Sequence, residues 1–384
     1  METSQRMTPK RRWLFLLGLV ILILAGLSVI FTRQLAQSRQ EADYLLALQE
    51  LAFNKYLNPP ASYDGVAHLG AWDGYLYAAP EYQCVLGGHY GLLAHSGTEM
   101  DKTVLWLQPG QECWPDHPNC GYILQKFTDE QALEYAVLAA DGGPFGPASL
   151  DPDNPVMDWN YIYVPTCDGS FHFGDAAVDY DGDGVPDHFH NGLRQTSAAV
   201  SLMKELFPNS RKILIAGSSN GGYGTFGTTP IVRLAFPNAE LYVLNDSGPG
   251  LFRIKEPALW PNLIETWNLT PMLPSDCPEC KTQLIYLFDW LLNRDPELKI
   301  GMYSSYQDAV ISNVVGMSGE ENERLLRSTT DQIHQNHPDT FKRYFIQGDS
   351  HCISDFYNQV NGITVWDWLD ALVNDHTSWK DILE

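Results

Sequence analysis

One pentapeptide in the sequence has the spacing of a nucleophilic serine on a tight turn. Residues Gly217-Ser-Ser-Asn-Gly221 match the pattern G-x-S-x-G. They follow the apolar run 212–216, which has the composition of a buried strand, and precede small residues that can open a helix. Such a turn has no room for side chains two residues on either side of the serine, and the next helix begins facing the charge that develops in acyl transfer. We therefore predict that Ser219 is a nucleophile.

A serine nucleophile needs a general base and an acid that orients the base. In the fold that uses this turn, the three groups occur in the order serine, acid, histidine, each after a later strand. Asp308 and His351 each follow a later apolar, strand-like run, in that order. We predict that His351 accepts the proton of Ser219 and that Asp308 holds the imidazole in the correct tautomer. The nearest rival for the acid is Asp349, two residues before the histidine.

An oxyanion hole needs backbone N–H groups that point at the developing negative charge. One donor comes from the residue after the nucleophile, which here is Asn220. The second comes from the loop after the third strand of the fold. Gly110 or Gln111 should supply it, because they follow the buried strand-like run 103–107.

Short apolar runs alternate along the chain with longer stretches of helical periodicity. The strand-like runs are residues 103–107, 212–216, 241–244, 300–303 and 343–346, and the helical stretches are residues 192–207, 284–292 and 365–373. This alternation is typical of a mostly parallel central sheet with helices on both faces. Together with the position of the serine turn, it predicts the α/β-hydrolase fold.

Composition and charge limit the kinds of partner. The 384 residues are 44% hydrophobic, which is enough for a large core, and residues 42–384 show no repeat or linker that would divide them. We expect one catalytic domain over that range. The formal net charge of -23 excludes nucleic acid as a partner and argues against a densely charged acidic polymer as substrate.

The N-terminal region has the pattern of a signal anchor. Residues Trp13 to Phe31 are uncharged and mostly aliphatic, long enough to cross a bilayer as a helix, and a basic cluster precedes them. The positive-inside rule then predicts a cytoplasmic tail over residues 1–12, a transmembrane segment over 13–31, a linker over 32–41 and an extracytoplasmic, membrane-anchored catalytic domain. A cleavable signal peptide is the alternative, although residues 34–37 make a poor cleavage site.

Seven cysteines suit an oxidising compartment, and the odd number leaves at least one thiol unpaired. Cys277 and Cys280 have the spacing of half a zinc site. No second C-x-x-C and no nearby pair of histidines completes four ligands. A disulfide in a small loop is therefore the prediction for this pair.

An acidic segment resembles the loop that wraps calcium in EF-hands. Asp179, Asp181, Asp183 and Asp187 stand at positions 1, 3, 5 and 9, with glycine at position 6. His190, a poor ligand for a hard cation, stands where the loop normally has glutamate. The alternatives are a structural calcium site, which would order the chain before the 192–207 helix, and a solvated acidic loop.

Taken in order, these residues resemble the pectin acetylesterase and Notum family of serine carboxylesterases, from about residue 84 to residue 357. The matching segments are Cys84-Val-Leu-Gly-Gly88, Leu107-Gln-Pro-Gly-Gln-Glu-Cys113, Asn154-Pro155 with Asp158-Trp-Asn160, Cys167-Asp-Gly169 with Gly174-Asp175, Gly217-Ser-Ser-Asn-Gly-Gly222, Asp246-Ser-Gly248 and His351-Cys352. The resemblance implies the same roles for Ser219, Asp308 and His351, with no cofactor for catalysis.

The resemblance also implies two disulfides, Cys113–Cys120 and Cys84–Cys167. The chain departs from the family at two places near the expected oxyanion hole. Pro109-Gly-Gln111 stands where the family has a run of glycines, and Asn220 stands where it has alanine. The acyl group of the substrate therefore does not follow from the resemblance.

The leading functional hypothesis is a carboxylesterase that removes O-acyl groups, such as O-acetyl groups of an extracellular glycan. The first alternative is an inactive, membrane-anchored glycan-binding or adhesion module, which would have no need of serine, acid and histidine together. The second is a thioesterase or peptidase with the same triad. Assays on esters of different acyl length, acetylated xylan, pectin and a peptide amide would discriminate among them.

Overall fold

The computed structural model describes residues 26–28, 42–59, 61–110, 112–115, 117, 129–141, 151–254 and 259–384. The chain divides into two compact units, residues 1–47 and 48–384. In the part that is described, no helix is both long enough and apolar enough to cross a membrane. The predicted transmembrane segment, Trp13–Phe31, lies outside the described residues except for Gly26–Ser28.

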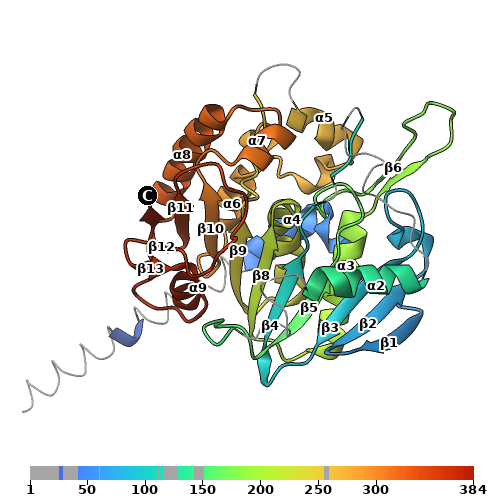
Figure 1. Cartoon of the computed structure of the whole chain (residues 1–384), viewed down its shortest axis with the longest axis horizontal. Coiled ribbons are helices and arrows are strands. Elements are labelled where there is room, and N and C mark those ends of the chain that lie inside the picture. The colour runs from blue at the N-terminus through green and yellow to red at the C-terminus, as the bar shows by residue number, and fades with distance from the viewer. Residues whose placement is uncertain are drawn as a thin grey trace, which may run out of the picture. The chain divides into compact units, whose positions relative to one another are not determined.

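A ten-stranded mixed sheet forms the centre of the second unit (Figure 1). Its order is β1 (Gly65–Leu69), β2 (Trp72–Tyr77), β3 (Tyr90–His95), β5 (Trp159–Val164), β4 (Glu99–Leu107), β8 (Lys212–Ser218), β9 (Glu240–Asp246), β10 (Lys299–Ser305), β11 (Phe341–Ile346) and β14 (Ile382–Leu383). Every neighbouring pair from β5 to β14 is parallel. The pairs β1–β2, β2–β3 and β3–β5 are antiparallel.

Helices cover both faces of this sheet. On one face, α2 (Asp129–Asp141) and α9 (Val365–Val373) share a hydrophobic cluster with β4, β8 and β9. On the other, α4 (Asn220–Ala235) packs on β8 and β9, and α3 (Gly192–Leu206) packs on α4. The mixed α/β class with a large, mostly parallel sheet is therefore as predicted.

The remaining elements lie around this framework. They are the helices α5 (Leu259–Thr266), α6 (Tyr286–Leu292), α7 (Ala309–Val314) and α8 (Gly319–Asn336), the 3₁₀ turns η1 (Ala52–Leu57), η2 (Pro80–Tyr82), η3 (Thr270–Met272) and η4 (Pro278–Lys281), and the short hairpins β6 (Ala176–Val178) with β7 (His188–His190) and β12 (Gln359–Val360) with β13 (Ile363–Thr364).

The central strands form where they were predicted, because their residues are apolar on both faces. In β8, Leu214 and Ala216 belong to the cluster under α2 and α9, while Ile213 and Ile215 are buried toward the opposite face. A parallel strand covered on both sides gives such a continuous apolar run. The predicted strand over 212–216 extends two residues further, to the residue before the serine.

Candidate active site

Ser219 lies on a strained turn between β8 and α4. Its φ of 53° and ψ of −117° lie outside the regions that residues with a side chain normally occupy. A Cβ atom on Gly217 would be 2.2 Å from the backbone oxygen of Gly221, and one on Gly221 would be 2.1 Å from that of Leu107. The two glycines of the motif are therefore required by close backbone contacts, as the sequence predicted. Ser219 itself is half-buried, so its position is accessible from solvent.

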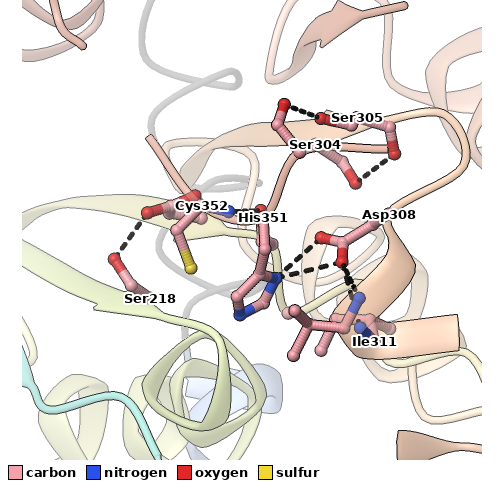
Figure 2. Close-up of polar contacts among 12 residues, drawn as sticks. Ser218, Ser304, Ser305, Asp308, Ile311, His351 and Cys352 are labelled. Atoms are coloured by element: carbon pink, nitrogen blue, oxygen red, sulfur yellow. Dashed lines mark hydrogen bonds and ion pairs between the residues drawn. The ribbon is translucent and has the colours of Figure 1, made fainter. Parts of the chain in front are cut away.

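Asp308 and His351 contact each other directly (Figure 2). His351 Nδ1 lies 2.8 Å from Oδ2 and 3.1 Å from Oδ1 of the carboxylate. The backbone N–H groups of Val310 and Ile311 also donate to Oδ1, both at 3.0 Å, because Asp308 is the N-cap of α7. These two backbone hydrogen bonds therefore fix the orientation of the Asp308 side chain independently of its contact with the His351 ring. Asp349, the rival acid, is exposed.

Ser219, Asp308 and His351 follow three parallel strands of one sheet, β8, β10 and β11, and so lie at the same edge. The thiol of Cys352 lies against the backbone of Ser219. In the view of Figure 2, the His351 ring lies between Asp308 on one side and Cys352 on the other. The Ser219 hydroxyl makes no hydrogen bond to His351 in the described residues. Contacts between nucleophile and base are often longer without substrate.

The loop proposed for the oxyanion hole lies against the serine turn. Gly110 has a φ of 90° and open space around its α-carbon. Gln108 anchors the start of this loop, because its backbone carbonyl accepts a hydrogen bond from His172 Nε2 at 3.0 Å. Burial lowers the pKa of His172, so the ring is neutral. Gln111, the alternative donor, lies outside the described residues.

Asn220 is the first residue of α4, as an oxyanion donor must be. Its side chain is 2% exposed, and neither its amide oxygen nor its nitrogen has a hydrogen-bond partner in the described part of the chain. This buried amide stands at a position where the resemblance implies alanine.

Asp246, the last residue of β9, is a further buried carboxylate at this edge and was not predicted as a site residue. The Ser218 hydroxyl donates to its carboxylate at 2.5 Å, and the Ile353 N–H donates at 3.1 Å and 3.2 Å. Desolvation by burial raises the pKa of Asp246 to about 6. The available signal was an aspartate two residues after the predicted strand 241–244, at the edge that carries the serine.

Two predicted disulfides are present, Cys84–Cys167 and Cys277–Cys280. Cys120, and with it the predicted Cys113–Cys120 pair, lies outside the described residues. Cys352 is a free cysteine. The C-x-x-C pair is thus a disulfide, and its sulfurs are not zinc ligands.

The acidic loop between β6 and β7 projects from the rest of the second unit (Figure 1). Ligand atoms of Asp179, Asp181 and Asp183 lie within 4.8 Å of one another. The fourth predicted ligand is elsewhere, because Asp187 accepts a hydrogen bond from Tyr180 N and pairs with His188. The structure therefore brings together three of the four predicted carboxylates.

His190 is buried, and both of its ring nitrogens are occupied. Nδ1 hydrogen-bonds the Asp168 carbonyl at 2.9 Å, and Nε2 hydrogen-bonds the Tyr180 hydroxyl at 2.8 Å. Burial lowers its pKa to about 4. His190 therefore anchors the base of the acidic loop and does not complete a metal site.

The sheet and the groups at its edge define a mixed α/β protein with a serine turn of the kind that hydrolases use. Comparison with known families takes this further. A family model described as pectinacetylesterase matches residues 83–258, which include the serine turn and the expected oxyanion loop. Over this range the chain is similar to the pectin acetylesterase family, whose members are carboxylesterases acting on ester bonds. No curated protein matches the sequence.

Proposed function

We propose that this chain is a serine carboxylesterase of the α/β-hydrolase fold, with Ser219 as nucleophile, His351 as base and Asp308 as the orienting acid. The observation that carries the proposal is the Asp308–His351 hydrogen bond at the sheet edge where the Ser219 turn lies. The strand order supports the fold, because serine, acid and histidine follow β8, β10 and β11 in the chain order that this fold uses.

In the proposed reaction, Ser219 Oγ attacks the ester carbonyl while its proton passes to His351 Nε2. Asp308 stabilises the imidazolium through Nδ1–H, and the N–H of Asn220 with that of Gly110 or Gln111 binds the oxyanion. The imidazolium then protonates the leaving alcohol, which leaves an acyl group on Ser219. Water, deprotonated by the same ring, hydrolyses this acyl-enzyme and restores the serine.

The proposed substrate is an O-acyl ester, and an O-acetylated extracellular glycan is the class that the family similarity favours. The net charge of -23 would repel a densely anionic polymer, so the glycan should be neutral or heavily esterified. The match to the pectinacetylesterase family model favours a small acetyl group over a long acyl chain. Acetyl esters should therefore react faster than octanoyl esters.

The test uses purified full-length protein with 4-nitrophenyl acetate, butyrate and octanoate, acetylated xylan, pectin and a peptide amide. Ser219→Ala should lower kcat by about 10⁶-fold, the loss typical of a removed serine nucleophile. Ser275→Ala is the matched control, because Ser275 is exposed and far along the chain from the turn. Hydrolysis of the amide but of none of the esters, or full activity of Ser219→Ala, would refute the proposal.

We also propose that Asp179, Asp181 and Asp183 hold a structural calcium ion. Their carboxylate oxygens are the ligands that calcium prefers, and Gly182 and Gly184 donate backbone hydrogen bonds to Asp179 that curve the loop around it. Three carboxylates are fewer than the six to eight oxygens that calcium takes, so backbone carbonyls and water would complete the shell. The ion would order this loop and play no part in the chemistry.

For location, we propose that residues 13–31 anchor the protein and that the catalytic domain is extracytoplasmic. The Cys84–Cys167 and Cys277–Cys280 disulfides support an oxidising compartment. Protease added outside intact cells should degrade the domain, and the protein should stay with membranes after a high-salt wash. A soluble form that begins near residue 37 would show cleavage instead, and a domain with reduced cysteines in the cytoplasm would exclude the proposed location.

A further inference from the structure

Asp246 occupies a central position at the sheet edge that carries the proposed triad. It ends β9, which lies between β8 and β10, the strands that precede Ser219 and Asp308. The carboxyl ends of these parallel strands meet at one edge, so the Asp246 side chain lies beneath the groups proposed to react. It is 2% exposed, and a buried carboxylate is retained only where hydrogen bonds and charge offset its desolvation.

Two segments far apart in the sequence are joined by this one residue. From β8, the Ser218 hydroxyl donates to the carboxylate at 2.5 Å, and the Ser219 N–H donates to the Asp246 backbone oxygen at 2.7 Å. From the segment after β11, the Ile353 N–H donates to the carboxylate at 3.1 Å and 3.2 Å. The residue before the serine and the residue two after the histidine thus bind the same carboxylate.

The groups that face Asp246 come from every element around it. His351 and Cys352, in the segment after β11, interact with the Asp246 carboxylate. So do Tyr303 in β10, Ser218 in β8 and Ser247 in the loop after β9. His351 is the only one of these five that can carry a positive charge. Asp308 contacts that ring from another strand, so the imidazole has a second carboxylate in its surroundings.

We propose that Asp246 is a positioning residue for the esterase reaction. Its carboxylate holds the segment that carries His351 against the serine turn and adds a negative charge near the imidazole. The inference rests on the roles proposed for Ser219 and His351. Asp246 would act through the histidine and would not touch the substrate.

The test compares Asp246→Asn and Asp246→Ala with Asp158→Asn, a matched control at an exposed aspartate. Asp246→Ala should lower kcat about a hundredfold with little change in KM, because a misplacement of about 1 Å costs about that much. Asp246→Asn should fall between Asp246→Ala and wild type, since its amide oxygen can still accept from Ile353 N–H. In both variants the low-pH limb of the kcat/KM profile should move to lower pH, because the loss of the negative charge of Asp246 disfavours the imidazolium.

A kcat within about threefold of wild type in both variants would overturn the inference. So would a large loss of kcat without movement of the low-pH limb, because a packing defect alone explains it. If Asp246→Ala does not fold, Asp246→Asn decides by the same two criteria. Ser219→Ala measured in parallel separates the two proposals. An active Ser219→Ala refutes the proposed function, whereas an inactive one beside unaffected Asp246 variants refutes only this inference.

Discussion

Replacing Asp308 with asparagine should reverse the hydrogen bond to His351 with almost no change of shape. Asp308 Oδ1 accepts from the backbone N–H groups of Val310 and Ile311, so the amide oxygen of asparagine must take that position. The amide NH₂ then occupies the Oδ2 position, 2.8 Å from His351 Nδ1 in the wild type. Because that group can only donate, the ring must accept at Nδ1 and carry its proton on Nε2. A protonated Nε2 cannot accept the proton of Ser219.

The expected loss follows from this wrong tautomer. An asparagine in place of the acid of a serine triad lowers kcat by about 10⁴-fold, which corresponds to about 5 kcal/mol of transition-state stabilisation. Stability should hardly change, because the asparagine oxygen still caps α7. Asp308→Ala would lose that cap as well, at a cost of about 1 kcal/mol in the free energy of unfolding.

The assay is the steady-state hydrolysis of 4-nitrophenyl acetate, with thermal melting of each variant to confirm folding. Asp349→Asn is the matched control, because Asp349 is an exposed carboxylate two residues before the histidine. It should keep wild-type turnover. If Asp308→Asn stays within about tenfold of wild type while folded, the tautomer argument is wrong and the acid must be sought elsewhere.

Three further predictions test other parts of the structure. Gly221→Ala places a Cβ 2.1 Å from the Leu107 carbonyl oxygen and should lower the urea-derived free energy of unfolding by about 1–3 kcal/mol. Gly65→Ala is the control, because a Cβ there meets nothing within 4 Å. Equal free energies of unfolding for the two variants would contradict the packing argument. Burial raises the pKa of Asp246 to about 6 from an unfolded value of about 4, so its stabilising contribution is complete below about pH 4 and is lost as the pH rises through about 6. The melting temperature of wild type should therefore fall relative to that of Asp246→Asn over this interval, and a constant difference would show that Asp246 does not titrate there. Excess EDTA should lower the melting temperature by removing calcium, and the double variant Asp181→Ala/Asp183→Ala should not respond; an unchanged wild-type curve would remove the calcium proposal.

The parts of the fold that could be predicted are those in which local sequence and burial agree. The central strands are continuous apolar runs because helices cover both faces, and β8 and β9 differ from prediction only at their ends. Helix α9 has the expected bounds, since Thr364 and Asp367 form a capping box that fixes its start. The antiparallel strands β1 to β3 were not predicted. In β1 the burial alternates between half-buried and exposed, so its sequence carries little signal.

The candidate site was predictable where a motif or chain order constrains it. The glycines around Ser219 are required by backbone contacts within one turn, and that requirement is visible in the sequence. Contacts between residues that are far apart in the sequence cannot be recognised from it in this way. Asp246 binds Ile353, which is 107 residues away, and only the pairing of strands reveals this. Asp187 has the correct spacing for a calcium ligand, yet it pairs with its neighbour His188 instead.

The most direct test of the central claim is to trap the nucleophile. The full-length protein is incubated with a fluorophosphonate, digested and mapped by mass spectrometry, with Asp308→Asn and Ser219→Ala treated in the same way. We expect one phosphonylated residue, Ser219, in the wild type, with activity lost in proportion to label. Asp308→Asn should be labelled slowly and Ser219→Ala not at all. Label on Ser218 or on another serine, or full inhibition of ester hydrolysis without label on Ser219, would contradict the assignment of the nucleophile.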